Sequence, residues 1–257
     1  LISGADAQML YNSLPEQARV GLRYDEGSKS VIGSTPIAVA NLDAFAQQYG
    51  ARTPNLRDLS RPEVMRIAKD EYYIDSRNLV ARSTEDPNWP KNNSLLKTIY
   101  ELAEQKLGKI DGPFMIEGFN FVPNQEDETG YGLSIVARSD FKVVQDERLD
   151  GKRNGESFSE VDDLGLPVFK RDGNRTWYAK KDGLSGLYLD RDLDLYSDDN
   201  NLANSDGNGR VVLVSTAEGG VQDFFNQKLA ELQRTSEAQI AEINNRYQRA
   251  EAVLRGK

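Results

Sequence analysis

Residues 187–196, with the sequence LYLDRDLDLY, alternate strictly between two kinds of side chain. Four of the five odd-numbered positions are leucine, and every even-numbered position is aspartate or tyrosine. Because successive side chains of a β-strand point to opposite faces of a sheet, this period of two predicts a strand with a buried leucine face and an exposed acidic face. Arg191 is the single departure on the leucine side, where it can pair with a neighbouring carboxylate.

The residues after this strand are polar up to Gly209 and then become apolar. The run SDDNNLANSDGNG is rich in turn-forming residues and predicts a loop, held to the protein by Leu202 and Ala203. The following RVVLV, residues 210–214, is a short continuous apolar run, which is typical of a central strand buried on both faces.

The exposed positions of this region use an unusual set of residue types. Lys, Glu, Gln and Thr are absent from residues 186–209. Tyrosine offers a rigid amphipathic contact surface, and asparagine, serine and glycine offer adaptable hydrogen bonding, as in antibody paratopes. These types are also reached from an asparagine codon by changing its adenines. The predicted ligand-binding residues are Tyr188, Asp190, Asp192, Asp194, Tyr196, Asp198, Asp199, Asn200, Asn201, Asn204, Asp206 and Asn208.

Residues 175–215 resemble the variable region of the target proteins of diversity-generating retroelements. In that family, adenine-directed mutagenesis varies side chains displayed on a C-type-lectin-like fold, close to that of formylglycine-generating enzymes. The resemblance implies a variable region at 186–209 whose twelve binding residues face the ligand. It also implies a fixed scaffold, made of Leu187, Leu189, Leu193, Leu195, Leu202, Ala203 and a strand over 209–214. In many family members the variable region ends the chain, whereas here more than thirty residues follow it.

Two other interpretations of the acidic stretch stay open. Asp190, Asp192 and Asp194 have the spacing that begins an EF-hand loop, but that loop needs Gly at its sixth position and Glu at its twelfth. Those positions hold Leu195 and Asn201, so an EF-hand is excluded, while a looser calcium site within residues 198–206 is not. The third interpretation is an edge strand protected by charge, followed by an ordinary polar surface loop.

The composition narrows the classes of function. The chain has no Cys and no His, which excludes thiolate metal sites and cysteine nucleophiles and removes the commonest general base. We therefore expect a protein that is not an enzyme and needs no cofactor or metal. The net charge of −9 argues against nucleic-acid binding, because such a surface repels phosphates. No apolar run approaches the roughly 20 residues that span a bilayer.

The chain divides into three predicted parts. Residues 1–110 read as mainly helical, with helices over 42–49, from Pro62 onward and over 94–107. Residues 111–216 are expected to form the C-type-lectin-like ligand-binding domain, with strands over 113–124, 130–138, 140–149 and 175–180. With the long helix at 217–257, the predicted fold class is α+β.

The C-terminal part carries apolar residues at heptad spacing without any Pro or Gly from Val221 to Leu254. A helix of this length extends about 50 Å at 1.5 Å per residue. One face of it carries the seam that predicts a coiled coil, and hence a homo-oligomer formed through residues 221–254. The seam residues are Phe225, Leu229, Leu232, Ser236, Ile240, Ile243, Tyr247, Ala250 and Leu254.

These patterns together predict a binding protein with a hypervariable surface and an oligomerising helix. The expected ligand is a macromolecule, with a protein as the favoured class, and multivalency would strengthen weak single sites. The alternatives are a structural or assembly protein of a phage or cell surface, and a calcium-dependent carbohydrate-binding domain. The sequence is compatible with the cytoplasm, a cell surface or a phage particle.

Overall fold

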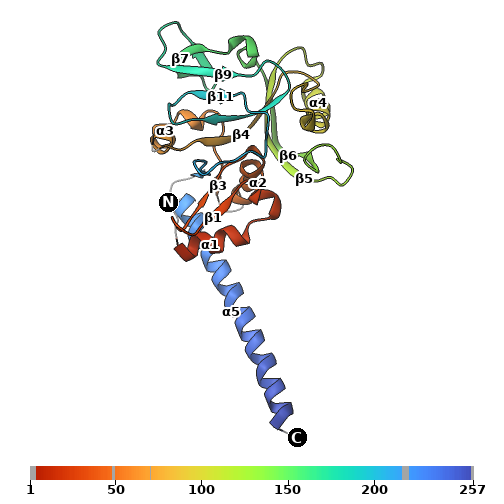
Figure 1. The fold of residues 1–257 in the computed structure, drawn as a ribbon, viewed down its shortest axis with the longest axis vertical. Coiled ribbons are helices and arrows are strands. Elements are labelled where there is room, and N and C mark those ends of the chain that lie inside the picture. The colour runs from red at the N-terminus through yellow and green to blue at the C-terminus, as the bar shows by residue number, and fades with distance from the viewer. Residues whose placement is uncertain (1–3, 48–49, 70, 216–219, 256–257) are drawn as a thin grey trace.

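The protein has the predicted α+β class, with one large mixed sheet and a long C-terminal helix (Figure 1). The computed structural model describes residues 4–47, 50–69, 71–215 and 220–255. The α-helices are α1 (Gly4–Ser13), α2 (Pro36–Gln47), α3 (Pro62–Lys69), α4 (Asn93–Leu107) and α5 (Gly220–Arg255). The strands are β1 (Arg23–Asp25), β2 (Ser30–Ile32), β3 (Ala51–Arg52), β4 (Ile74–Ala81), β5 (Phe114–Pro123), β6 (Leu133–Gln145), β7 (Glu156–Val161), β8 (Pro167–Phe169), β9 (Arg175–Ala179), β10 (Leu184–Leu189), β11 (Leu195–Ser197) and β12 (Val214–Ser215).

The large sheet has eight strands in the order β6-β5-β4-β10-β11-β9-β7-β8. All neighbouring strands are antiparallel except β11 and β9, which are parallel. In the sheet, β11 lies between β9 and β10. In the sequence, β10 lies between β9 and β11. Two-stranded sheets form separately from β1 with β2 and from β3 with β12.

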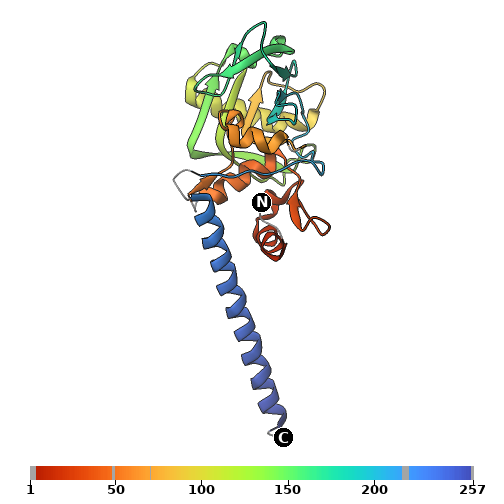
Figure 2. The same ribbon diagram turned by 90° about the vertical axis from the view of Figure 1, so that its left-hand side faces the viewer.

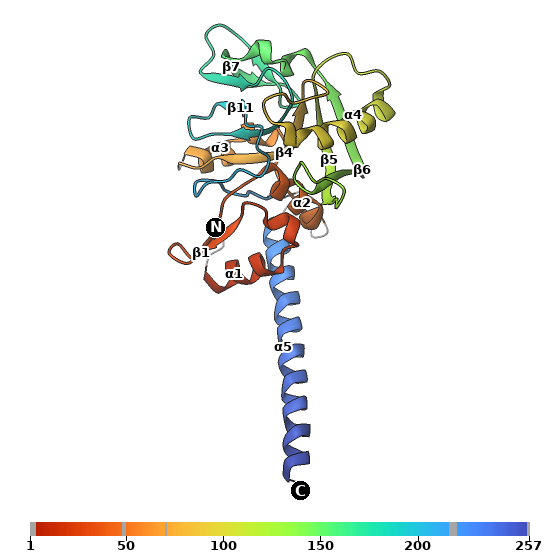
Figure 3. The same ribbon diagram turned by 45° about the vertical axis from the view of Figure 1, so that its right-hand side comes forward.

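Helices pack on both faces of the large sheet. On one face, Ile37 of α2 and Leu95 and Ile99 of α4 are buried in a cluster with strands β4, β5 and β6. On the other face, Val64 of α3 is buried with Trp177 and other residues of β7, β9 and β10. Figure 3 shows α4 lying against the sheet, with α2 near its lower end.

The predicted single strand over 187–196 is wrong, because these residues form a hairpin. β10 ends at Leu189, and β11 begins at Leu195 and pairs back onto it, with Tyr188 opposite Tyr196. The turn is closed by hydrogen bonds from Leu193 N to Asp190 O, at 2.9 Å, and from Asp190 N to Asp194 O, at 3.2 Å. The alternation fits both arms of the hairpin, and this is why it reads as one continuous strand.

The hairpin changes the predicted faces at its turn. Leu187, Leu189 and Leu195 are fully buried as predicted, whereas Leu193 is half-buried and has a positive φ of 69°. Arg191, predicted on the buried side, is exposed on the turn. The edge-strand interpretation is wrong as well, because β10 pairs with β4 on one side and with β11 on the other.

The part of the chain predicted to be mainly helical also contributes β4, a strand near the middle of the sheet. All eight residues of β4 are buried, and four of them are polar or charged. Arg77 reaches Asp43 of α2 at 2.9 Å, and Asn78 accepts a hydrogen bond from Leu56 N at 2.8 Å. The sheet therefore combines a strand from residues 1–110 with strands from residues 111–216.

The strands predicted over 130–138 and 140–149 form one long strand, β6, paired with β5. The register shifts between Glu117 and Phe119, at Gly118. Gly118 has a φ of 78°, and a Cβ atom there would lie 2.5 Å from Asp140 O. Glycine is therefore required at this register shift. Glu117 itself pairs with Arg77 at 3.4 Å and with Lys142 at 3.2 Å.

The predicted buried strand over 210–214 is wrong in all but its last residue. Val211, Val212 and Leu213 are half-buried and lie outside any strand, and only Val214 and Ser215 pair, with β3. The preceding Gly209 makes an isolated bridge with Tyr73. The apolar run thus connects the polar loop to α5 instead of forming part of the large sheet.

The long C-terminal helix is confirmed and extends away from the rest of the protein, as Figure 2 shows from the side. Leu229 and Leu232 are half-buried near its start, whereas Ile240, Ile243 and Tyr247 are 56%, 65% and 70% exposed. Ser236 is exposed too, and the side chains of Phe225, Ala250 and Leu254 lie outside the described ones. Within the described part of the chain, no helix combines the length and hydrophobicity needed to span a bilayer.

Candidate ligand-binding cavity

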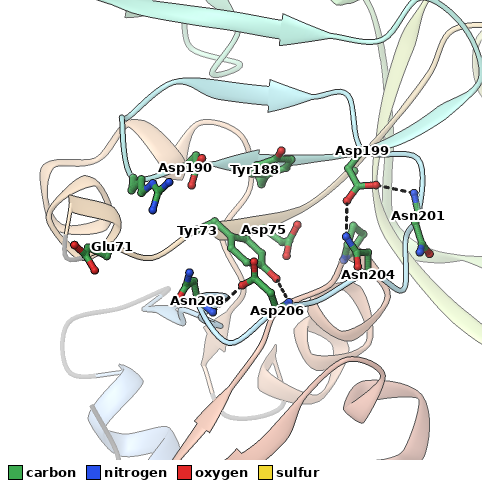
Figure 4. Close-up of a pocket in the computed structure, with 13 residues that line it drawn as sticks. Glu71, Tyr73, Asp75, Tyr188, Asp190, Asp199, Asn201, Asn204, Asp206 and Asn208 are labelled. Atoms are coloured by element: carbon green, nitrogen blue, oxygen red, sulfur yellow. Dashed lines mark hydrogen bonds between the residues drawn. The ribbon is translucent and has the colours of Figure 1, made fainter.

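A cavity of about 250 Å³ lies between β10, the residues just before and within β4, and the loop over 199–208 (Figure 4). Segments far apart in the sequence meet there, since α2 and β4 precede β10 by more than a hundred residues. The lining residues are Pro36, Glu71, Tyr73, Asp75, Gly186, Tyr188, Asp190, Arg191, Asp199, Asn201, Asn204, Asp206 and Asn208.

Part of the cavity wall depends on a close approach of β10 to the first turn of α2. Thr35 Oγ1 accepts a hydrogen bond from Ala38 N at 3.0 Å, and Pro36 follows as the first helical residue, so this end of α2 is well defined. A Cβ atom on Gly186 would lie 2.5 Å from Pro36 Cγ. Only glycine leaves room for the proline ring at this position.

Tyr73 joins the polar loop to the rest of the protein. Its hydroxyl donates to Ser34 O at 3.0 Å and accepts from Asp206 N at 3.2 Å. The residue after the loop is held too, because Gly33 N donates to Gly209 O at 3.0 Å. Burial raises the pKa of the Tyr73 phenol, with the Asp75 carboxylate adding to the effect, so the hydroxyl keeps its proton and can donate.

Asp75 is the most deeply buried acidic residue of the cavity wall. It is 5% exposed, and its Oδ2 atom has no hydrogen-bond partner. In Figure 4 it lies between Tyr73 and Asn204. Burial raises the pKa of Asp75 to about 7, and the nearby carboxylates of Asp199 and Asp206 add to the shift. The cavity therefore contains a carboxyl group that titrates near neutral pH.

Tyrosine rings form a stack that ends at the cavity. Tyr178 of β9 stacks on Tyr196 of β11 with ring centroids 4.5 Å apart, and Tyr196 stacks on Tyr188 of β10 at 5.1 Å. Tyr73 then meets Tyr188 edge-to-face at 6.0 Å. The pairing of adjacent strands brings these rings together, because residues opposite each other in a sheet lie side by side.

Asp and Asn side chains shape the loop by local hydrogen bonds. Asp199 Oδ1 accepts from Asn201 N at 2.8 Å, and Asp206 Oδ1 accepts from Asn208 N at 2.7 Å. Asn201 Oδ1 accepts in turn from Ala203 N at 3.3 Å. Short polar side chains that bind the backbone two residues ahead are the usual means of forming such turns. Part of the richness in Asp and Asn thus has a structural cause.

Seven of the twelve residues predicted to bind a ligand line this cavity, and five do not. Those in the cavity come from the end of β10 and from the loop: Tyr188, Asp190, Asp199, Asn201, Asn204, Asp206 and Asn208. Those outside it are Asp192, Asp194, Tyr196, Asp198 and Asn200. The exposure predicted for all twelve is wrong for seven, which are half-buried: Tyr188, Asp190, Asp194, Tyr196, Asp199, Asn200 and Asn201.

Hydrogen bonds account for several of the positions outside the cavity. Asp192 accepts from Asp194 N and from the Tyr196 hydroxyl, each at 3.0 Å, and so stabilises the hairpin turn. Asp194 accepts from Thr176 N of β9. The carbonyl of Asn200 accepts from Asn92 Nδ2 at 3.0 Å. The turn also means that Asp190, Asp192 and Asp194 do not form the straight row that a single strand would give.

The sequence interpretation missed Pro36, Glu71, Tyr73 and Asp75 of the cavity wall. Residues 73–75 alternate between polar and apolar side chains, because Tyr73 and Asp75 lie on either side of Ile74. The same kind of alternation predicted the strand at β10. The signal is short, because the next residues of β4 are buried on both faces and include polar ones. Among the residues that the structure describes, no group of three or more acidic side chains is arranged to hold a metal ion.

Comparisons of the chain with protein-family models, with curated proteins and with solved structures found no match in any of the three.

Proposed function

We propose that this protein is a non-enzymatic binding protein whose ligand is a protein, held at the cavity between β10 and the 199–208 loop. The observation that carries the proposal is the convergence of seven predicted positions on one concave surface together with Tyr73 and Asp75. A concave site with a few polar groups at its base is typical of ligand binding. The tyrosine stack and the short polar side chains supply the residue types of a paratope.

The proposal includes a diversified surface on a C-type-lectin-like fold, as in the target proteins of diversity-generating retroelements. The separation of residues 186–209 into buried leucines and more exposed polar residues supports the proposal. Leu187, Leu189, Leu195 and Leu202 are fully buried, while exposed and half-buried Asp, Asn and Tyr residues lie between them. The test is the neighbouring DNA: a reverse transcriptase gene and an imperfect copy of the segment encoding 186–209 are expected. Their absence would contradict diversification and leave ligand binding to be tested separately.

Ligand binding is tested with a cavity-blocking variant. Asn208 is exposed and lines the cavity, so Asn208→Trp introduces bulk there without disturbing the core. Asn174, exposed in the turn before β9, provides the matched control Asn174→Trp. The wild type and both variants are applied to an array of peptides of varied charge. We expect Asn208→Trp to lose peptides that the control retains; identical patterns for all three proteins would contradict the proposed site.

An assembly role is the second candidate, and α5 favours it. Ile240, Ile243 and Tyr247 are large apolar side chains more than half exposed on the heptad seam of a helix that extends from the body of the protein. Such a row is expected to be covered by another helix. The two roles are compatible, because oligomerisation would bring several cavities to one partner and raise its apparent affinity.

A further inference from the structure

Acidic side chains outnumber basic ones in the lining of the cavity. Among the described residues that line it, five carry carboxyl groups and one, Arg191, carries a guanidinium. The latter is exposed on the hairpin turn. The carboxyl groups belong to Glu71, Asp75, Asp190, Asp199 and Asp206. Such a surface attracts cations and repels anions.

Asp75 gives this charge a definite position. Asp75 is 5% exposed and lines the cavity, and its Oδ2 is enclosed in the wall without a hydrogen-bond partner. The side chain of Ser34 lies near this carboxyl and lowers its pKa, against the larger effect of burial. A buried polar atom without a partner costs free energy, and native proteins satisfy nearly all such atoms. A positive charge brought into the cavity would stabilise the ionised form of Asp75, which burial disfavours.

The size and the walls of the cavity favour a single long side chain. The volume of about 250 Å³ is below the roughly 300–1,000 Å³ of pockets that hold whole drug-sized ligands. The Pro36 ring and the face of Tyr188 can pack against an aliphatic stem. Tyrosine faces also attract a cationic group at the end of such a stem.

We infer that the cavity receives the cationic side chain of a lysine or arginine residue from the protein ligand, with its charged end at Asp75. The inference rests on the proposed function and specifies the chemistry of the same site. Asp206 lies beside the entering charge with a spare carboxylate oxygen, because only its Oδ1 accepts a short loop hydrogen bond. Asp199 lines the cavity too, and its two oxygens accept from Asn201 N and from Asn204 Nδ2. The aliphatic stem packs on Tyr188.

Binding of a cation is coupled to the proton on Asp75. The groups that interact with this carboxyl are Ser34, Tyr73, Tyr188, Asp199 and Asp206. The other charged residues that line the same cavity are Glu71, Asp190 and Arg191. The carboxyl titrates near pH 7, and only its ionised form pairs fully with the ligand. The competent fraction falls about tenfold from pH 8 to pH 6, so we expect the affinity to fall by about the same factor.

The experiment measures binding of two cationic probes to the full-length protein by NMR titration at pH 8. The two probes are Nα-acetyl-lysine amide and Nα-acetyl-arginine amide, which keep the side-chain charge and distinguish the two side chains. N-acetyl-norleucine amide and N-acetyl-citrulline amide are neutral counterparts of similar shape. We expect at least one cationic probe to bind ten or more times tighter than its counterpart, and to shift signals of residues lining the cavity. Equal binding of charged and neutral probes would overturn the inference.

Variants assign the charge to Asp75. Asp75→Asn keeps the shape and is expected to reduce affinity for the cationic probe at least tenfold and to abolish its pH dependence. If Asp75→Asn folds poorly, Asp206→Asn in the exposed loop repeats the test. It is expected to reduce the affinity for the cationic probe about threefold or more. Asp163→Asn removes the same charge at a side chain that is 97% exposed outside this cavity, and should bind like the wild type. Arg191→Gln should bind more tightly, because it removes the like charge.

The peptide array separates the two proposals. Cavity-dependent binding that is confined to peptides with Lys or Arg supports both. Cavity-dependent binding of neutral or acidic peptides keeps the proposed function and overturns the inference. A pattern that is the same with and without Asn208→Trp contradicts the proposed function itself. In that case, binding of the cationic probes decides whether the cavity still recognises a cation.

Discussion

The ring of Tyr196 lies on that of Tyr188 with centroids 5.1 Å apart and an angle of 14° between the planes. Tyr188 lines the cavity and Tyr196 does not, so one ring belongs to the cavity wall and the other supports it. The hairpin that pairs β10 with β11 creates this relationship. The support extends to Tyr178 on the far side of Tyr196, at 4.5 Å.

Replacing the supporting ring should weaken the fold and loosen the cavity. Tyr196→Ala removes two stacked pairs, each worth about 0.5–1.5 kcal/mol, so we expect a loss of about 1–3 kcal/mol in unfolding free energy. Tyr196→Phe keeps both pairs and loses the hydrogen bond to Asp192, for about 1 kcal/mol or less. Urea denaturation measures both; an equal loss for the two variants would contradict a role for stacking.

The leucines of the hairpin should differ in their contribution to stability. Leu189 is fully buried in β10, and Leu189→Ala should cost about 2–5 kcal/mol. Leu193 is half-buried with a positive φ, a conformation that glycine adopts without strain. Leu193→Gly should therefore cost less than Leu189→Ala, by at least about 1 kcal/mol. Thermal and urea unfolding test the order, and the reverse order would contradict the turn.

The buried carboxyl of Asp75 should make the protein less stable as pH rises through neutrality. The pKa of Asp75 is raised by burial to about 7 from 3.8, so between these values the folded protein holds a proton that the unfolded chain has released. The unfolding free energy then falls with rising pH in that window. Asp75→Asn removes this dependence, and its stability relative to wild type should rise from pH 4.5 to pH 8 by about 1–4 kcal/mol. Urea curves for both proteins that stay parallel over this range would contradict the assignment.

The seam of α5 should hold copies of the chain together. Introducing aspartate at Ile240, Ile243 and Tyr247 places charge on the exposed apolar face and should give a monomer. The matched control carries aspartate at Ala238, Ala241 and Asn245, which lie away from the seam by helical spacing. Light scattering at tens of micromolar gives the mass. A monomeric wild type, or an equal effect of both triple variants, would contradict the coiled coil.

Divalent metal should have no effect on the stability of the fold. Among the residues that the structure describes, no group of three acidic side chains is arranged to hold a metal ion. Thermal melts in excess EDTA and in millimolar calcium are expected to overlay. A rise in melting temperature of more than a few degrees with calcium would instead favour the carbohydrate-binding alternative.

The sequence by itself determined the parts that depend on local patterns. The α+β class, the helices from Pro62 and over 94–107, the strand over 175–180 and the long helix α5 follow from periodicity and end signals. The buried state of Leu187, Leu189 and Leu195 follows from their alternation with polar residues. The grouping of Tyr, Asp and Asn around the cavity was also predictable in part, because their types and spacing are visible in the chain.

Only the tertiary structure decided where the chain turns and which segments meet. A period of two is the same along one strand and along the two arms of a hairpin, so it cannot reveal the turn over 190–194. β4 is buried on both faces, and its Arg77 and Asn78 pair there with Asp43 and the Leu56 amide, so the sequence lacks the alternation of a half-buried strand. Tyr73 and Asp75 reach the cavity only because β4 pairs with β10. Contacts between residues more than a hundred positions apart therefore made the site, and local sequence carries no record of such contacts.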